Sequence, residues 1–154
     1  MRSANCSAFS LVSTLAREFP SYCDGRSFNG RFVWFLKRAQ IFVADVWAAF
    51  EGSGFGEFRD IDSITMFADY RVPQQLCALG ILKYSERLFN KLVKEDGAVT
   101  DDEEAEIRGC SIHAVELLRS RNANAIQIDF LLWDEAKASK LDAWPIHKKR
   151  TIFY

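Results

Sequence analysis

Histidine is scarce in this chain, and its scarcity excludes several kinds of active site. The 154 residues contain two histidines, His113 and His147, which lie far apart and have no second ligand at helical spacing. No serine or cysteine lies in a recognisable nucleophile elbow. The glycine-rich segment Gly52–Gly56 lacks the lysine that follows a phosphate-binding loop, so it is interpreted as a turn. We therefore expect no metal and no organic cofactor, and His113 is interpreted as a helix-face residue.

Cysteine is present but is not arranged for disulfide or metal chemistry. The four cysteines lie at positions 6, 23, 77 and 110, and no two have the spacing of a metal clip or a redox pair. Cys77 and Cys110 occur in apolar sequence and are predicted to be reduced core residues. This pattern predicts a reducing, cytoplasmic location.

Long apolar runs and clustered basic residues are also missing. The formal net charge is −1, whereas a general grip on nucleic-acid backbone needs a basic face. The one basic run, His147–Arg150, is interpreted as a solvated tail. The most apolar segment, Phe32–Phe50, is interrupted by charged and amide side chains and is not predicted to span a membrane. We expect no direct nucleic-acid partner and no membrane partner, and the sequence leaves the oligomeric state open.

The N-terminal segment allows two interpretations. Residues 1–17 contain two arginines, four serines and no acidic residue, a composition that faintly resembles a transit peptide. However, Leu11, Leu15 and Phe19 repeat at four-residue spacing and lead directly into the rest of the chain. This spacing favours an amphipathic helix.

What the chain does have is enough apolar sequence for a core. Hydrophobic residues make up 49% and aromatic residues 14%, which excludes a disordered chain and suits one domain over residues 1–154. No segment alternates with period two for long, so the fold class is predicted to be all-α, with at most one marginal strand. Residues 22–30 are expected to form a polar connector. Helices are predicted over Ser10–Phe19, Arg31–Glu51, Pro73–Leu79, Ser85–Gly97, Thr100 to about Arg121, and Ala123–Lys140.

Two of these helices carry further expectations. The helix over Arg31–Glu51 is apolar on most of its circumference and is therefore predicted to be central and buried. Thr100 and Glu103 have the spacing of a capping box, in which the hydroxyl holds a free amide and the carboxylate reaches back. The acidic run Asp101–Glu106 then lies at the positive end of a helix, so its structural interpretation is preferred to a catalytic one.

The segment Asp60–Gln74, DIDSITMFADYRVPQ, is the best candidate for a functional site. Asp69 lies between Phe67 and Tyr70, and acidic residues interleaved with aromatic ones at the edge of a core are typical of small-molecule pockets. A carboxylate in an apolar wall can stabilise positive charge that develops on a sugar ring, because a low dielectric strengthens the attraction. The alternatives for Asp69 are an ion pair with Arg71 or a helix cap.

A second pair of carboxylates lies in the segment IDFLLWDEA. Asp129 and Asp134 bracket Phe130 and Trp133. On a regular helix Asp129 and Asp134 are separated by about 140°, so they do not share a face, although Phe130 and Asp134 do. The alternatives are a salt bridge for Asp129 and a solvated position for Asp134.

Taken together, ordered blocks of sequence resemble the queuosine salvage family, the queuosine 5′-phosphate N-glycosylases. The resemblance extends from about Leu15 to Tyr154. The blocks are FLKRAQIFVADVW, DIDSITMFADYRVPQ, EIRGCSIHAVELL, IDFLLWDEA and PIHKKRTIFY.

The resemblance implies a fold and an activity. It implies a helical fold similar to the helical DNA glycosylases, and hydrolysis of queuosine 5′-phosphate to queuine and ribose 5-phosphate. By position, the catalytic aspartate of the family falls on Asp69, and an aromatic substrate contact falls on Phe67. Further substrate-binding residues fall on Asp129, Phe130 and Asp134. The family commonly has tyrosine in place of Phe130, so that hydroxyl is absent here.

The resemblance also implies a difference in length, since members of the family are longer and carry an N-terminal half. The chain is therefore expected to correspond to the C-terminal part, with uncovered apolar surface on Arg31–Glu51. Two further function classes stay open. One is a non-catalytic remnant that binds a nucleotide or a partner chain, and the other is a glycosylase that acts on nucleic acid.

Overall fold

The computed structural model describes residues 5–154, and the chain divides into two compact units. The first unit comprises the chain up to Phe67 together with Ile152–Tyr154, and the second comprises Ala68–Thr151. The described residues are mostly helical, as predicted, with a small two-stranded sheet in addition. None of the helices in this part of the chain is long and apolar enough to cross a membrane. Residues 1–4 of the segment whose composition resembles a transit peptide, residues 1–17, lie outside the described residues.

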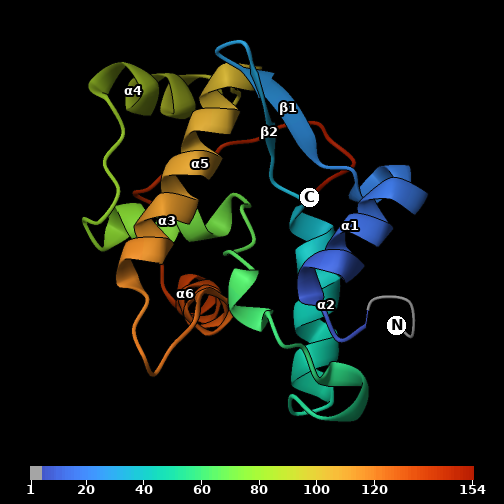
Figure 1. Ribbon diagram of the computed structural model, residues 1–154. Coiled ribbons are helices and arrows are strands. Elements are labelled where there is room, and N and C mark those ends of the chain that lie inside the picture. Colours follow the sequence, from blue (N-terminus) through green and yellow to red (C-terminus); the bar gives the residue numbers. More distant parts are fainter. Residues whose placement is uncertain (1–4) are drawn as a thin grey trace. The chain divides into compact units, whose positions relative to one another are not determined.

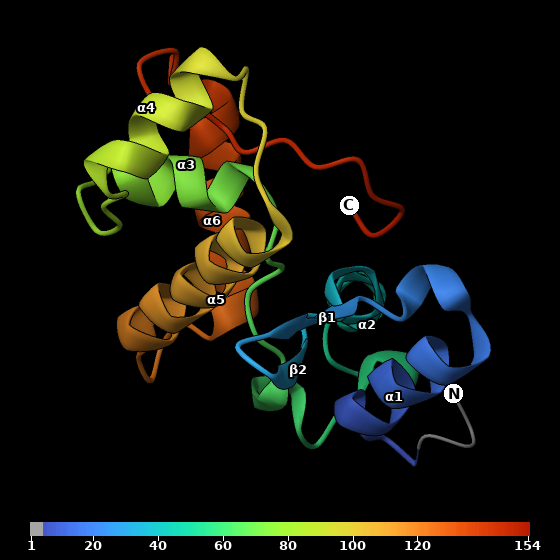
Figure 2. The same cartoon turned by 90° about the horizontal axis from the view of Figure 1, so that it is seen from above.

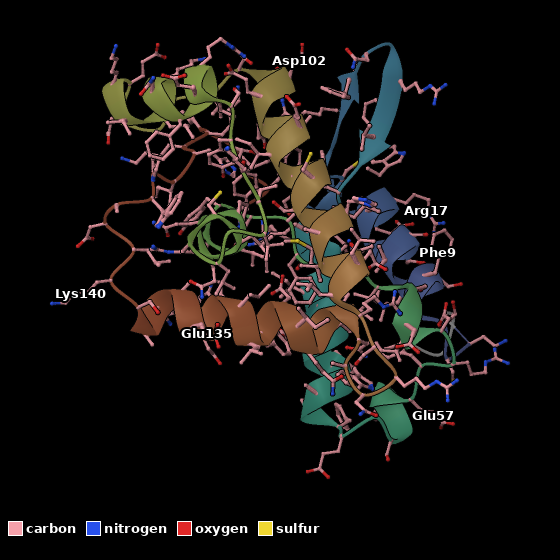
Figure 3. All side chains as sticks on the ribbon, turned by 90° about the vertical axis from the view of Figure 1, so that its left-hand side faces the viewer. Phe9, Arg17, Glu57, Asp102, Glu135 and Lys140 are labelled. Atoms are coloured by element: carbon pink, nitrogen blue, oxygen red, sulfur yellow. The ribbon has the colours of Figure 1, made fainter. Side chains whose placement is uncertain are left out.

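The first unit is built on two helices, α1 (Ala8–Glu18) and α2 (Lys37–Ala49), which pack against each other (Figure 2). Its short 3-10 turns are η2 (Pro20–Tyr22), η3 (Gly54–Gly56) and η4 (Ile61–Ser63). Helix α1 confirms the amphipathic helix predicted near the N-terminus. Phe9 and Arg17 project outward from it (Figure 3).

The start of α1 is held by two residues from different parts of the first unit. The hydroxyl of Ser7 accepts a hydrogen bond from the Ser10 amide at 3.1 Å. The carboxylate of Asp60 accepts from the amides of Ala8 at 2.6 Å and Phe9 at 3.2 Å. These bonds satisfy backbone donors that a helix leaves without intrahelical partners. The N-terminal end of the candidate segment Asp60–Gln74 therefore has a structural role in the first unit.

A β-hairpin corrects the predicted course of residues 25–36. Strands β1 (Gly25–Phe28) and β2 (Arg31–Trp34) pair antiparallel around a two-residue turn at Asn29 and Gly30. Both turn residues have positive φ, 50° and 74°, as a type I′ turn requires, and Asn-Gly is the strongest short signal for such a turn. The predictions of a connector and of a helix from Arg31 were therefore wrong.

Helix α2 is less buried than predicted. Its buried side chains lie on one face, as in an amphipathic helix, and Phe42 and the C-cap residue Phe50 are exposed. Apolar composition around a helix indicates burial only where neighbouring elements cover the whole circumference. Other aromatic residues in this unit are also exposed, namely Phe9, Phe19, Phe32, Trp34 and Phe55.

The second unit contains the remaining four helices. They are α3 (Arg71–Ala78), α4 (Glu86–Lys94), α5 (Asp101–Leu118) and α6 (Ala125–Ala138). Helices α3, α5 and α6 pack against one another in pairs (Figure 1). A smaller apolar cluster joins α4 to α5 through Leu88, Leu92 and Ile107. The predicted helices in this part of the chain are confirmed, and their observed ends differ from the predicted ones by one to three residues.

Local capping explains where these helices begin. The Ser85 hydroxyl accepts a hydrogen bond from the Leu88 amide at the start of α4. The Thr100–Glu103 capping box is present in both directions. Asn124 and Gln127 form a second capping box at the start of α6. Asp102 lies in the acidic first turn of α5 (Figure 3), which supports the structural interpretation of the acidic run.

The cysteines follow the prediction only in part. All four thiols are free, and Cys77 is buried. Burial raises the pKa of the Cys77 thiol to about 11, so it stays protonated at neutral pH. Cys110 is exposed, which corrects its assignment to the core. It lies on the outer face of α5, although apolar residues follow it in sequence.

Candidate functional site around Asp69

Asp69 lies just before α3 and is 6% exposed. Its Oδ1 accepts hydrogen bonds from the amides of Arg71 at 2.8 Å and Val72 at 3.0 Å. These are the first two amides of the helix, so Asp69 caps α3 from the position before Tyr70. Of the two structural alternatives, the helix cap is therefore observed. The guanidinium of Arg71 forms no ion pair with Asp69 and instead donates to Gln74 Oε1 at 3.0 Å.

A buried arginine fixes the backbone next to Asp69. Arg108, on α5, is fully buried, and its Nε donates to the carbonyl oxygen of Ala68 at 2.9 Å. A guanidinium nitrogen of Arg108 also lies 3.4 Å from Glu104 Oε1, one turn earlier on the same helix. The sequence interpretation missed this pair. The signal was present as a Glu-to-Arg spacing of four on a predicted helix.

His147 is a second buried group that sequence reasoning misplaced. It is 1% exposed, so the interpretation of His147–Arg150 as a solvated tail was wrong at its first residue. Burial, together with the positive charge of Arg108, lowers the pKa of His147 to about 4. The imidazole is therefore neutral at physiological pH. A short polar run gave no indication of this burial, because the contact depends on the tertiary fold.

Helix α6 presents its two carboxylates on different faces. Asp129 is 4% exposed and lies on the same face as Ile126 and Leu132, towards the core. Asp134 is exposed, and so is Phe130 at 37%. The predicted separation of Asp129 from Phe130 and Asp134 is therefore confirmed.

The predicted site residues thus fall into three groups. Asp69 and Asp129 are buried carboxylates of the second unit, at the start of α3 and on the inner face of α6, two helices that pack together. Phe130 and Asp134 lie on the outer face of α6. Phe67 is the last residue of this part of the first unit, and its side chain is buried.

The arrangement favours electrostatic chemistry by carboxylates. A negative charge held away from water by fixed amide donors attracts a developing cation more strongly than a solvated one does. Among residues 5–154, no cluster of three or more histidine, cysteine or acidic side chains has the geometry to hold a metal ion.

Comparison with known proteins identifies the family. The model of a family described as queuosine salvage protein matches residues 1–154. The chain belongs to this family. The queuosine 5′-phosphate N-glycosylase/hydrolase of Mus musculus is 46% identical over 164 residues, covering 96% of the chain and 48% of the relative.

Relatives of the same name occur in distant organisms. The protein of Schizosaccharomyces pombe is 51% identical over 132 residues, covering 82% of the chain and 38% of the relative. The protein of Sphaerobacter thermophilus is 44% identical over 158 residues, covering 98% of the chain and 49% of the relative. The chain therefore spans about half the length of the curated relatives it matches, or less.

Proposed function

We propose that the chain hydrolyses the N-glycosidic bond of queuosine 5′-phosphate and releases queuine, which is reused for tRNA modification. Family membership and relatives that carry this activity in their names support the proposal. The structural observation that carries it is the buried carboxylate of Asp69, which two backbone amides orient at the start of α3. We expect the reaction to need no metal and no organic cofactor.

Asp69 is proposed as the catalytic residue. Queuine is a deazapurine and lacks the ring nitrogen at which a purine leaving group is usually protonated. Catalysis therefore depends more on stabilising the oxocarbenium-like sugar, either by electrostatic attraction or by nucleophilic attack of the carboxylate. The amide bonds to Oδ1 keep the carboxylate in place while charge develops, so little reorganisation is needed.

The base is proposed to be recognised by two carboxylates and two aromatic rings, namely those of Asp129, Asp134, Phe67 and Phe130. Queuine carries a secondary amine that is cationic at neutral pH, and carboxylates are suitable partners for it. Because Asp129 and Asp134 face different sides of α6, a base that contacts both must lie across the helix. A base that lacks hydrogen-bond donors of this kind would leave a buried carboxylate unpaired, so the site would reject it. Phe67 and Phe130 are the proposed stacking surfaces, worth about 1–3 kcal/mol for each base by analogy with other base-binding proteins.

A non-catalytic remnant is the second candidate function. The hydrogen bonds of Asp69 to α3 give this residue a structural role that needs no catalysis. The exposed positions of Phe130 and Asp134 also suit a surface that binds a nucleotide or a partner chain. The third class, a glycosylase acting on nucleic acid, would bind in a strongly salt-dependent way.

Four further expectations from the sequence stay predictions. They are a helical architecture similar to the helical DNA glycosylases, one functional domain over residues 1–154, correspondence to the C-terminal part of the family, and a cytoplasmic location. The oligomeric state stays open.

Turnover by the 154-residue chain tests the proposal. Incubation with queuosine 5′-phosphate, followed by chromatography, is expected to show queuine and ribose 5-phosphate in equal amounts. Titration calorimetry on the same protein separates the two candidates. Heat of binding without product favours the remnant. The absence of both heat and product would contradict the proposed substrate.

A further inference from the structure

The second unit contains a pocket that the proposed catalytic residues do not line. Its volume is about 510 Å³, and it lies between the start of α3, the end of α4 and the chain that follows α6. In Figure 2 the chain after α6, in red, runs beside α4 and α3. The lining residues that matter here are Arg71, Gln74, Asp96, Asp142, Trp144 and Lys148.

Gln74 fixes the geometry of one wall. This side chain is buried, and its Nε2 donates to the carbonyl oxygens of Leu141 at 3.2 Å and Trp144 at 2.7 Å. Because both partners are acceptors, the amide nitrogen must face them and Oε1 must face the other way. Oε1 then accepts the hydrogen bond from Arg71. The orientation of the Arg71 side chain therefore depends on the loop that closes the pocket.

Arg71 brings a positive charge to this wall. Its guanidinium lies over the Tyr70 ring, 5.6 Å from the centroid, and is half-buried. Its side chain makes one hydrogen bond, to Gln74, and no ion pair with any residue that the structure describes. A guanidinium has five N–H donors in a planar fork that matches a phosphate group, so most of its donors remain for a ligand.

The other charged side chains of the pocket are Asp96, Asp142 and Lys148, so the formal charges of its lining sum to zero, but none of these residues forms an ion pair with Arg71. Lys148 Nζ lies 2.6 Å from Asp96 Oδ1, so these two residues compensate each other. Asp142 is exposed, and its repulsion of an anion is therefore screened by water and salt. Removal of the Asp142 charge should consequently strengthen the binding of an anion.

We propose that Arg71 binds the phosphate group of a sugar phosphate in this pocket. This assignment rests on the proposed function, in which the phosphate is the 5′-phosphate of queuosine 5′-phosphate. The Arg71 amide lies 2.8 Å from Asp69 Oδ1, so the phosphate-binding side chain and the proposed catalytic carboxylate come from the same turn of chain. The phosphate and the anomeric carbon of a ribose 5-phosphate are also only a few bonds apart. Arg71 would then make the site prefer a nucleotide over a nucleoside.

Binding of ribose 5-phosphate tests the phosphate site without any need for turnover. Calorimetry on the 154-residue chain should detect ribose 5-phosphate and not ribose. Arg71→Gln should weaken this binding by about tenfold or more, because it removes a charge-assisted contact, and Arg71→Lys should restore part of it. Asp142→Asn should tighten it. The matched control is Arg121→Gln, which removes the same charge from an exposed position of the second unit that does not line the pocket.

The outcomes separate a local effect from a global one. Equal weakening by Arg71→Gln and Arg121→Gln would mean that only net charge matters, and the proposal would be wrong. Unchanged binding in Arg71→Gln, or no binding of ribose 5-phosphate to the unaltered chain, would also overturn it. Thermal unfolding of each variant verifies that it is folded, and Arg71→Lys serves if Arg71→Gln does not fold.

Kinetics then identify the source of the phosphate. Arg71→Gln should lower kcat/KM for queuosine 5′-phosphate by about ten- to a hundredfold and leave the value for queuosine unchanged. If the unaltered chain turns over neither compound while Arg71 governs binding of ribose 5-phosphate, the proposed function fails and the phosphate site stands. If Arg71→Gln lowers both values equally, the phosphate role fails and the proposed function stands.

Discussion

The side chain of Arg108 holds the carbonyl oxygen of Ala68, the residue directly before Asp69. The distance from Nε to this oxygen is 2.9 Å, and the two residues are 40 positions apart in the sequence. Arg108 also faces Glu104, and both side chains are fully buried. A buried charge on α5 therefore fixes the backbone just before the start of α3.

Replacement of Arg108 by methionine should destabilise the protein by about 3–5 kcal/mol, because Glu104 loses a buried cationic partner. Urea unfolding followed by circular dichroism measures the change. The double variant Arg108→Met, Glu104→Met should recover part of the loss, since it leaves no buried charge from this pair. Strict additivity of the two single effects would show that the pair is not coupled.

Stability should fall as the pH decreases from about 6.5 to about 4 because of His147. Burial, together with Arg108, lowers the pKa of this residue to about 4 in the folded state, so only the unfolded chain binds the proton in this range. The stabilisation is fully present above pH 6.5 and is lost progressively towards pH 4. The urea midpoint of His147→Gln should vary less between pH 7 and pH 5 than that of the unaltered chain. An equal pH dependence would contradict the assignment.

Glu103 should act over a lower pH range. A hydrogen bond from Lys91, at 2.6 Å, and one from the Thr100 amide lower its pKa to about 2. A carboxylate whose pKa is lowered on folding stabilises the folded state fully when the pH is above its ordinary pKa. This contribution is lost as the pH falls from about 4.5 to 2. Glu103→Gln should remove this part of the acid transition and leave the part between pH 6.5 and 4.5. The measurement is the thermal midpoint at closely spaced pH values.

Gly97 should be far less tolerant of substitution than Gly80. Both have positive φ, 84° and 72°, but a Cβ at Gly97 would clash with the carbonyl oxygen of Ile146, whereas nothing lies within 4 Å at Gly80. Gly80→Ala should cost about 1–2 kcal/mol from the left-handed backbone alone. Gly97→Ala should cost clearly more, because the loop after α6 must also move. Equal free energies of unfolding would contradict this explanation.

Much of the fold could be predicted because its signals are local. Helix boundaries follow caps such as Ser85 and Thr100, whose side chains satisfy amides three residues away. The hairpin was missed although Asn29-Gly30 is a strong sequence signal for its turn. The apolar, helix-like pattern after Arg31 was given more weight than this signal.

The site was only partly predictable, for a different physical reason. The position of Asp69 at the edge of the core follows from its aromatic and apolar neighbours, and its side chain is buried. The burial of Arg108 and His147 depends on elements that pack together from distant parts of the sequence. Such contacts cannot be predicted from residue types alone. The exception is a pair such as Glu104 and Arg108, whose spacing places both residues on one helix face.

Replacement of Asp69 by asparagine is the most direct test of whether this carboxylate is catalytic. Asparagine retains a side-chain oxygen that can cap α3, so the variant should keep its thermal stability while it loses the negative charge. We predict that the rate of queuine release from queuosine 5′-phosphate falls by about a hundredfold or more, with folding intact. A stable variant that releases queuine at the unaltered rate would contradict a catalytic role for Asp69 and leave the residue as a helix cap alone.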